Sequence, residues 1–299
     1  MHTMTIAEAR RRMRARGIRQ LLTDPVANPK VAKGLKYGVM TSPLHLAPAR
    51  LSGYEVCPKA SPGCREACLH TAGNPAYLQK KQKARINKTR FYFEDRSAFL
   101  IVLAAEIAAL EKKARLTGMQ PAVRLNATSD IPWERIQIPH DAWWPHVGLG
   151  YGWEDHAPNI MEVFPNVEFY DYTKITKRIR EYVCGGMPSN YYLVLSATED
   201  NQKDVREALT WGASVAMVFE GKVLPHGYVP DLDVGTHQYS PVYVDIDGGK
   251  HERYEVVDGD ISDYLVPHQH RPGYEGKIIG LHAKGKARQD NTGFVRAIK

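Results

Sequence analysis

The chain has 299 residues, of which 43% are hydrophobic and 24% charged, so it can bury a large core like an ordinary globular protein. No apolar run approaches the length that spans a bilayer, and the N-terminus lacks the apolar segment and cleavage site of a signal peptide. We therefore expect a cytoplasmic protein with no membrane contact. Four cysteines are too few for a disulfide framework, and a net charge of +7 suits a polyanionic partner.

The first predicted elements are a basic N-terminal arm over residues 1–30, expected to be helical, and a short strand that ends near Thr41. A cysteine-containing loop follows. A long helical stretch is then expected from about Pro75 to Thr117, with a break near Phe93 to Arg96 and a stop at Gly118.

The rest of the chain repeats a pattern in which an apolar strand ends in small polar or charged residues. The last three of these strands begin about 25 residues apart, the spacing of βα units in a parallel sheet. The pattern predicts an α/β fold, as a complete or partial (β/α) barrel, with a doubly wound open sheet as the alternative. The strands are AVRLNATSD, VEFYDYTK, YYLVLSATED, SVAMVFEGK and a final KIIGLHAKG, and the predicted crossover helices are KITKRIREYV and NQKDVREALTWG.

We expect residues 31–299 to form a single barrel-like domain with two long loop insertions, near 136–165 and near 224–256. The first insertion is rich in Trp, His and Gly, and the second reads as a β-rich excursion with a DIDGGK turn. Long loops at a barrel rim set substrate choice in many enzymes, and the alternative is a packed surface elaboration.

Three of the four cysteines, Cys57, Cys64 and Cys68, lie in the short stretch CPKASPGCREACLH. Ser61 as N-cap and Pro62 as first helical residue predict a helix start inside this stretch. Cys64 and Cys68, at i and i+4, would then share one helix face, and Cys57 would fold over from the preceding loop. This arrangement suits metal binding.

Three thiolates could hold a [4Fe-4S] cluster with one open iron, a [3Fe-4S] cluster, or a zinc ion completed by His70 or water. Sulfur-only ligation favours iron–sulfur or zinc over hard cations. Unligated or disulfide-linked cysteines are the third possibility. Cys184, alone in YVCGGMP, is expected to be a buried small hydrophobe and no ligand.

Polar residues at the carboxyl ends of the strands would gather on the barrel rim that holds the cysteine loop. Such residues also serve as helix caps and turns. A Lys that ends an apolar strand needs an anion, and Asp171 is the expected partner of Lys174. In an enzyme, Asp130, Asp171 and Glu199 would handle protons, while Lys174 and Lys284 would hold an anionic group. The candidate catalytic residues on the rim are Asn126, Asp130, Asp171, Lys174, Glu199 and Lys284. The candidate cofactor-binding residues are Ser129 and Ser196, and Glu220 is a further rim residue.

Two basic segments, Arg10–Arg16 and Lys80–Arg90, could contact the phosphates of a nucleic acid. Tyr92 and Phe93 would then offer rings for stacking on unpaired bases. The alternative is a solvated helix face whose long basic side chains cover apolar surface.

The chain resembles the phage and prophage gene product 88 family over most of its length, from about Gly38 to Val295. The blocks that carry this resemblance are CPKASPGCREACLHTAG, TRFYFEDRSAFL, VRLNATSDIPWE, FYDYTK, YLVLSATE, DGDISD and IIGLHAKGKARQDNTGFV. The resemblance implies a phage-encoded protein used in the host cytoplasm, with the three cysteines as cluster ligands.

The chain is also loosely similar to radical S-adenosylmethionine enzymes, which place three cysteines in a loop after the first strand of a partial barrel. Those enzymes usually space the cysteines C-x-x-x-C-x-x-C, whereas this chain has C-x6-C-x3-C and no Gly-Gly-Glu motif after the second strand. S-adenosylmethionine binding is therefore possible but not favoured.

Two functions are consistent with these features. The first is an iron–sulfur enzyme of redox or radical type that acts on an unknown, anionic small molecule. The alternative is a non-catalytic nucleic-acid-binding or host-modulating protein with a structural or redox-sensing iron–sulfur or zinc site. Polar rim residues on successive strands favour the enzyme, since a structural cluster requires none of them.

Overall fold

The structure is a computed structural model that describes residues 4–27, 29–68, 75–143, 158–245, 247–262, 264 and 276–298. The chain divides into two compact units. The first unit comprises residues 1–58, 74–171 and 187–192, and the second comprises residues 59–73, 172–186 and 193–299. The single domain expected for residues 31–299 stays a prediction. Among the described helices, none has the length and apolar content needed to cross a membrane.

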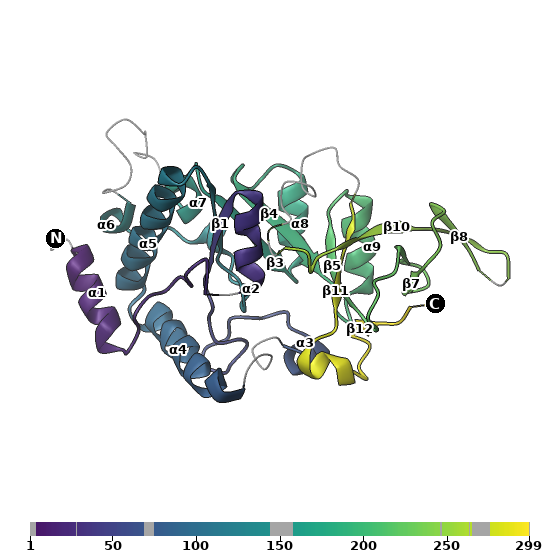
Figure 1. The fold of residues 1–299 in the computed structure, drawn as a ribbon, viewed down its shortest axis with the longest axis horizontal. Helices are drawn as coiled ribbons and strands as arrows, with labels where there is room; N and C mark the ends of the chain where they lie inside the picture. The colour runs from purple at the N-terminus through teal and green to yellow at the C-terminus, as the bar shows by residue number, and fades with distance from the viewer. Residues whose placement is uncertain are drawn as a thin grey trace. The chain divides into compact units, whose positions relative to one another are not determined.

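Two long helices, α4 (Pro75–Glu94) and α5 (Arg96–Leu116), form the helical stretch expected in the first unit (Figure 1). The break falls at Asp95, where a φ of −148° takes the backbone out of the helical region. Gly118, with a φ of 66°, follows α5 in the left-handed conformation that glycine adopts at helix ends. Most of α5 is buried, so this helix supplies much of the unit's core.

The N-terminal arm is helical, as expected. Helix α1 (Ile6–Ala15) begins at Thr5, whose side chain accepts a hydrogen bond from the Glu8 N–H at 3.1 Å. Its buried residues Ala9 and Met13 lie at i and i+4, and the helix packs against α5.

The strands of the first unit pair in parallel in the order β1-β2-β3. These are β1 (Val39–Pro43), β2 (Gln120–Arg124) and β3 (Glu168–Thr173), with Val39 opposite Gln120 and Ala122 opposite Glu168. All five residues of β1 are buried, as in a parallel strand covered on both faces. The division between the units falls within β3, after Asp171. The other described helices of this unit are α2 (Pro29–Ala32), η1 (Lys33–Tyr37), η3 (Trp133–Arg135), α6 (His140–Trp143) and α7 (Ile160–Val163).

The second unit is built on the parallel run β4-β5-β11-β10. Strand β5 (Val215–Phe219) pairs with β4 (Tyr191–Ser196), β11 (Ile278–His282) and the short β12 (Val295–Arg296), and β11 pairs with β10 (Tyr254–Asp258). Helices α8 (Thr176–Val183) and α9 (Gln202–Thr210) are the expected amphipathic crossover helices. The unit also holds α3 (Pro62–Glu66) and η5 (Gly285–Gln289).

Residues 224–256, expected as a β-rich insertion, carry several short antiparallel strands. Strand β6 (Gly227–Val229) pairs with β10 and with β7 (Val234–Thr236), while β8 (Val242–Val244) and β9 (Lys250–Glu252) form a separate two-stranded sheet. The DIDGGK sequence connects β8 to β9. In the other expected insertion, residues 144–157 lie outside the described part of the chain.

The predicted α/β class and the mostly parallel strand pairing are confirmed. Closure into a barrel is not: within the described residues, no strand pairing closes a sheet on itself. The hydrophobic pattern of a strand shows that both of its faces are buried, but it does not show whether the first and last strands meet.

Candidate functional site

Cys57, in the first unit, is half-buried against the loop that follows β2. Its sulfur accepts a hydrogen bond from the Ala49 N–H at 3.4 Å and lies 3.8 Å from the Thr128 carbonyl oxygen. Ala49 has a φ of 48°, an uncommon left-handed conformation for a residue with a side chain. The Asp130 N–H also bonds to the Val56 carbonyl at 2.7 Å, so the cysteine loop is anchored to the β2 loop.

Cys64, in the second unit, lies in the short helix α3. The Ser61 hydroxyl accepts the Cys64 N–H at 3.2 Å, and Pro62 is the first helical residue, which confirms the predicted helix start. The helix ends at Glu66, however, and Cys68 follows the C-cap. The expectation that Cys64 and Cys68 share one helix face is therefore wrong, because the helix is too short to contain both.

Glu199, which follows β4, holds the start of α3. Its carboxylate accepts the Ser61 Oγ–H and the Gly63 N–H, each at 2.7 Å. Gly63 is closely packed, since an added Cβ would clash with Thr292 Oγ1 and lie 2.9 Å from Glu199 Oε1. The structure thus gives Glu199 a positioning contact with the cysteine helix, and its expected role in proton transfer stays a prediction.

None of the four cysteines is linked in a disulfide. Cys57, Cys64 and Cys68 are half-buried, whereas Cys184 is exposed at the C-terminal end of α8. The expectation that Cys184 is buried is wrong, because the residue is the exposed C-cap of the short helix α8. His70, the candidate fourth ligand, lies outside the described residues.

Asn126, which follows β2, and Asp171, which lies within β3, form a buried network in the first unit. The Asn126 N–H and side-chain amide donate to the two Asp171 carboxylate oxygens at 2.6 and 3.1 Å, and the Tyr191 hydroxyl donates to Asp171 at 3.1 Å. The Asn126 carbonyl oxygen accepts from Ser129 Oγ at 2.8 Å and from Trp133 Nε1 at 3.2 Å. Asp171 is only 1% exposed. The arrangement brings together three predicted site residues, Asn126, Ser129 and Asp171, and their hydrogen bonds connect the loop after β2 to β3.

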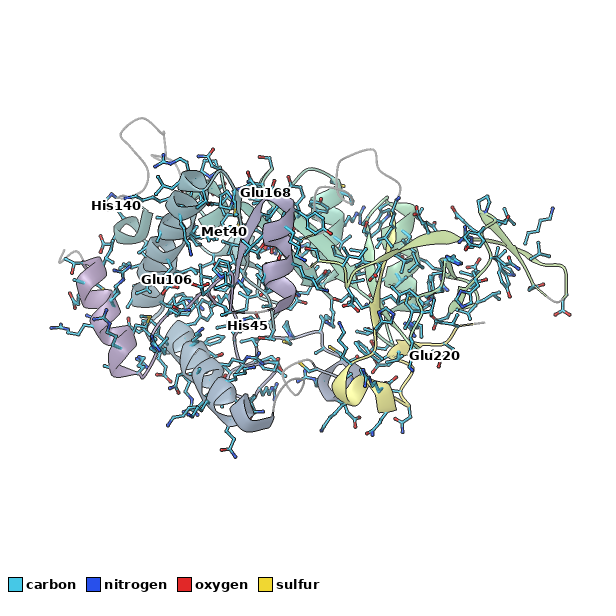
Figure 2. The ribbon with its side chains drawn as sticks, in the orientation of Figure 1. Met40, His45, Glu106, His140, Glu168 and Glu220 are labelled. Carbon is cyan, nitrogen blue, oxygen red and sulfur yellow. The ribbon has the colours of Figure 1, made fainter. Side chains whose placement is uncertain are left out.

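Several other predicted site residues make structural contacts. Asp130 is buried, and Lys174 is half-buried directly after β3. The Ser196 carbonyl accepts from Asn201 Nδ2 at 3.0 Å. Glu220, labelled in Figure 2, is exposed and its carboxylate accepts the Ile298 N–H at 3.0 Å. These positions illustrate the turn and strand-end roles that polar residues after strands commonly take.

A family model described as Gene product 88 matches residues 15–298. The chain belongs to the Gene product 88 family. Searches of the curated proteins and of the solved structures found no match. The predicted family is confirmed, and the looser similarity to radical S-adenosylmethionine enzymes stays a prediction.

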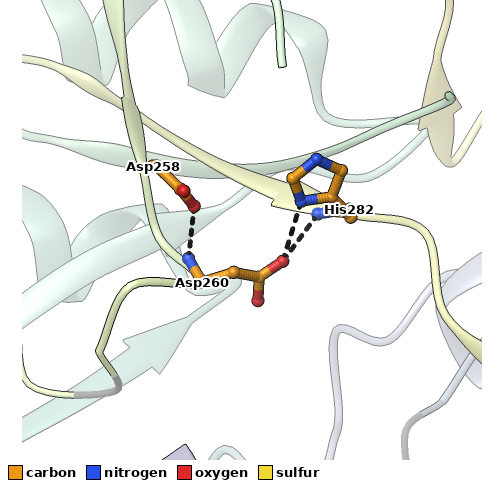
Figure 3. Close-up of side chains that lie close together, drawn as sticks. All are labelled: Asp258, Asp260 and His282. Atoms are coloured by element: carbon orange, nitrogen blue, oxygen red, sulfur yellow. Dashed lines mark hydrogen bonds and ion pairs between the residues drawn. The ribbon is translucent and has the colours of Figure 1, made fainter. Parts of the chain in front are cut away.

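This member of the Gene product 88 family has a second group of polar residues that the sequence did not reveal. Asp258, Asp260 and His282 lie close together at the ends of β10 and β11 in the second unit (Figure 3). Lys284 donates to Asp260 Oδ1 at 2.6 Å, which supplies the anion that the sequence required for this lysine. The sequence signal for this group was DGD at the end of β10 and LHAK at the end of β11. These segments become neighbours only because the two strands pair.

The basic helix α4 differs from the expected nucleic-acid surface in two respects. Lys88 donates to the Leu21 carbonyl at 2.6 Å, so its ammonium group is directed into the protein. Tyr92 is only 2% exposed and packs edge-on against Phe99, so it cannot stack on a base. Phe93 stacks on Tyr54, with ring centroids 4.4 Å apart. The apolar side of the helix had to face the core, and the tyrosine lies on that side.

A pocket of about 350 Å³ lies in the first unit and is lined by cationic side chains from three segments of the chain. Its lining includes Glu106 of α5, labelled in Figure 2, which accepts the Leu22 N–H at 2.7 Å. Burial raises the pKa of Glu106. The cationic side chains that line the pocket are Arg10, Arg14, Arg19 and Lys113.

Proposed function

We propose that this protein binds an iron–sulfur cluster through Cys57, Cys64 and Cys68. The observation that carries the proposal is that all three clustered cysteines are half-buried and outside any disulfide, whereas the isolated Cys184 is exposed. A half-buried thiol can be shielded from solvent and still reach a ligand. An exposed thiol, by contrast, has no such protection.

The surroundings of the cysteines support this proposal. The Ala49 N–H donates to the Cys57 sulfur, and hydrogen bonds to ligand sulfurs tune an iron–sulfur cluster. The caps on α3 hold the backbone at Cys64. Three thiolates suit a [4Fe-4S] cluster with one open iron or a [3Fe-4S] cluster, and zinc is the alternative occupant.

We further propose a redox or radical-type reaction on an anionic small molecule, carried out by a phage-encoded protein in the host cytoplasm. The parallel strands follow chain order over β1-β2-β3 in the first unit and over β4-β5-β11 in the second, where β10 is the exception because it lies beside β11 out of order. A (β/α) barrel has this order, whereas a doubly wound sheet reverses it, so a partial barrel is the architecture we favour. Lys174 and Lys284 would hold the anion near the strand ends. S-adenosylmethionine is not the favoured cofactor.

The test is anaerobic purification followed by analysis of iron, zinc and acid-labile sulfide. We expect a brown protein that contains iron and sulfide, with the visible absorbance of sulfur-to-iron charge transfer. Cys57→Ala, Cys64→Ala and Cys68→Ala should each abolish the colour, whereas the matched control Cys184→Ala should retain it. Stoichiometric zinc without sulfide would contradict the proposal.

A second candidate function, non-catalytic binding of nucleic acid, is favoured by the cation-lined pocket at Arg10, Arg14, Arg19 and Lys113. Cationic groups that converge on one pocket can contact consecutive phosphates. Arg12 and Arg16 are less suitable, because Arg12 pairs with Glu8 at 2.7 Å and Arg16 pairs with Glu94 at 2.5 Å. The helix α4 is a less suitable nucleic-acid surface, because the Lys88 ammonium group is directed into the protein.

A further inference from the structure

A cluster of two aspartates and one histidine lies in the second unit at the carboxyl ends of neighbouring parallel strands. Asp258 is the last residue of β10, Asp260 follows two residues later, and His282 is the last residue of β11. The two strands are in register, with Asp258 opposite Gly280. Strand β5 lies on the other side of β11 and continues towards Lys222. Three adjacent strand ends thus contribute to the cluster, the location where parallel sheets commonly bind ligands.

The turn that carries both aspartates is held tightly against β11. Gly259 separates them, and an added Cβ there would lie 2.6 Å from Ile279 Cγ2 and 2.8 Å from Leu281 Cδ2. The Gly259 N–H donates to the Gly280 carbonyl at 2.8 Å, and the Asp260 N–H donates to Asp258 Oδ1 at 2.8 Å. A side chain at this position would force Ile279 and Leu281 to move, so glycine lets the turn lie close to β11.

The His282 ring lies between two acceptor oxygens. Its Nε2 is 3.1 Å from the Lys222 carbonyl oxygen, and its Nδ1 is 3.1 Å from Asp260 Oδ2 (Figure 3). A carbonyl oxygen only accepts, so Nε2 carries a hydrogen. Nδ1 then faces Asp260 Oδ2 as an acceptor, a position in which both atoms can contact one metal ion. A backbone carbonyl that fixes one ring nitrogen is the usual partner of a histidine that binds metal through the other.

We propose that Asp258, Asp260 and His282 bind a divalent transition-metal ion. Their ligand atoms all lie within 4.8 Å of one another, close enough to surround a single ion. Two carboxylates and one imidazole suit Mn²⁺, Fe²⁺ or Zn²⁺, and three protein ligands leave positions open for water or a substrate atom. The side chains of Asp260 and His282 are 16% and 27% exposed, so solvent ions can reach them.

Lys284 determines what else the site binds. Its ammonium group donates to Asp260 Oδ1 at 2.6 Å and is 46% exposed. Two carboxylates, one ammonium and a divalent ion leave a net charge of one positive unit, which favours an anionic oxygen ligand such as phosphate. Lys284 offsets part of the Asp260 charge, so it weakens binding of the bare ion and supplies a hydrogen-bond donor for the anion.

The experiment titrates the full-length protein with Mn²⁺ and follows the electron paramagnetic resonance signal of the free ion. Mn²⁺ is the chosen probe because oxygen and imidazole ligands bind it well and thiolates do not. We expect one saturable site per chain. His282→Gln and Asp258→Asn should each weaken it by at least the roughly 10- to 100-fold that loss of an outer-shell partner costs. Circular dichroism checks that the variants are folded.

His251→Gln is the matched control. His251 also lies between two aspartates, with Nε2 2.9 Å from Asp245 and Nδ1 3.6 Å from Asp231. The carboxylates face opposite ring nitrogens, so no single ion can contact all three groups, and Mn²⁺ binding should be unchanged. Lys284→Met should tighten binding of the bare ion and abolish the further tightening that inorganic phosphate produces in the unmodified protein. The absence of a saturable site, or equal losses in His251→Gln and His282→Gln, would overturn the proposal.

Discussion

Lys88 shows how one side chain in a basic run can be withdrawn from the surface. Its ammonium group donates to the Leu21 carbonyl and faces the Glu106 carboxylate, which itself accepts the Leu21 N–H at 3.0 Å. Burial lowers the pKa of Lys88 to about 8, although the nearby Glu106 charge opposes this shift. A lysine with these contacts is held inside the first unit and is not available to bind phosphate.

The lowered pKa of Lys88 predicts a specific dependence of stability on pH. Between about pH 8 and the ordinary lysine pKa of 10.5, the unfolded chain binds more protons than the folded chain, so stability rises with pH. Across this window the unfolding free energy should rise by about 1 to 3 kcal/mol more in the unmodified protein than in Lys88→Met. Urea denaturation at several pH values measures the difference. Lys80→Met, at an exposed position of the same helix, should behave like the unmodified protein, and a pH-independent difference for Lys88→Met would contradict the assignment.

At the scale of an element, α3 is too short to be stable through its own hydrogen bonds. It has five residues, and its first turn is held by Ser61 within the chain and by the distant Glu199. The side chain of Thr292 packs directly against Gly63. The conformation at Cys64 therefore depends on two loops that lie more than a hundred residues further along the chain.

Gly63→Ala should displace α3, because the new methyl group would clash with Thr292 Oγ1. We expect a loss of about 1 to 3 kcal/mol of stability together with reduced iron content, without any change to a cysteine. Thr292→Ala removes the clashing hydroxyl, so the double variant should recover part of both losses. Urea unfolding and iron analysis of the four proteins form a double-mutant cycle. If the two substitutions were simply additive, the proposed contact would not be responsible.

At the scale of the whole molecule, the cationic side chains behind the net charge of +7 differ in their surroundings. Some arginines are neutralised by carboxylates, such as Arg12 by Glu8 and Arg16 by Glu94, while Arg10, Arg14 and Arg19 converge on the pocket in the first unit. Composition alone cannot distinguish these two groups, since it counts every arginine equally.

This difference leads to a prediction for the nucleic-acid hypothesis. A variant in which Arg10, Arg14 and Arg19 are all replaced by Gln should bind a single-stranded oligonucleotide with a weaker salt dependence. The slope of log K against log salt should fall in magnitude by about 2, since each phosphate contact contributes roughly 0.7. Gln at Arg12 and Arg16 should change the slope less. Fluorescence anisotropy at several salt concentrations measures it. Equal slopes in the triple variant and the unmodified protein, or no binding at low salt, would remove the support for this function.

The interactions that could be predicted from the sequence are those between residues close together in the chain. The cap at Ser61 and Pro62, the break between α4 and α5, the stop at Gly118 and the apolar parallel strands all depend on a few consecutive residues. The spacing of Cys57, Cys64 and Cys68 is visible for the same reason. Local backbone preferences and hydrophobic periodicity are sufficient for these features.

Contacts between distant segments were decided by strand pairing and packing. Hydrogen bonds connect Ser61 to Glu199, Asn126 to Asp171 and Lys284 to Asp260, which are separated in the sequence by 138, 45 and 24 residues. The side of α4 that faces the core, and with it the burial of Tyr92, was also settled by packing. The Asp258, Asp260 and His282 cluster exists only because β10 and β11 pair in parallel and in one register. A shift of one residue would turn these side chains to the opposite face, and no local feature of the sequence encodes that register.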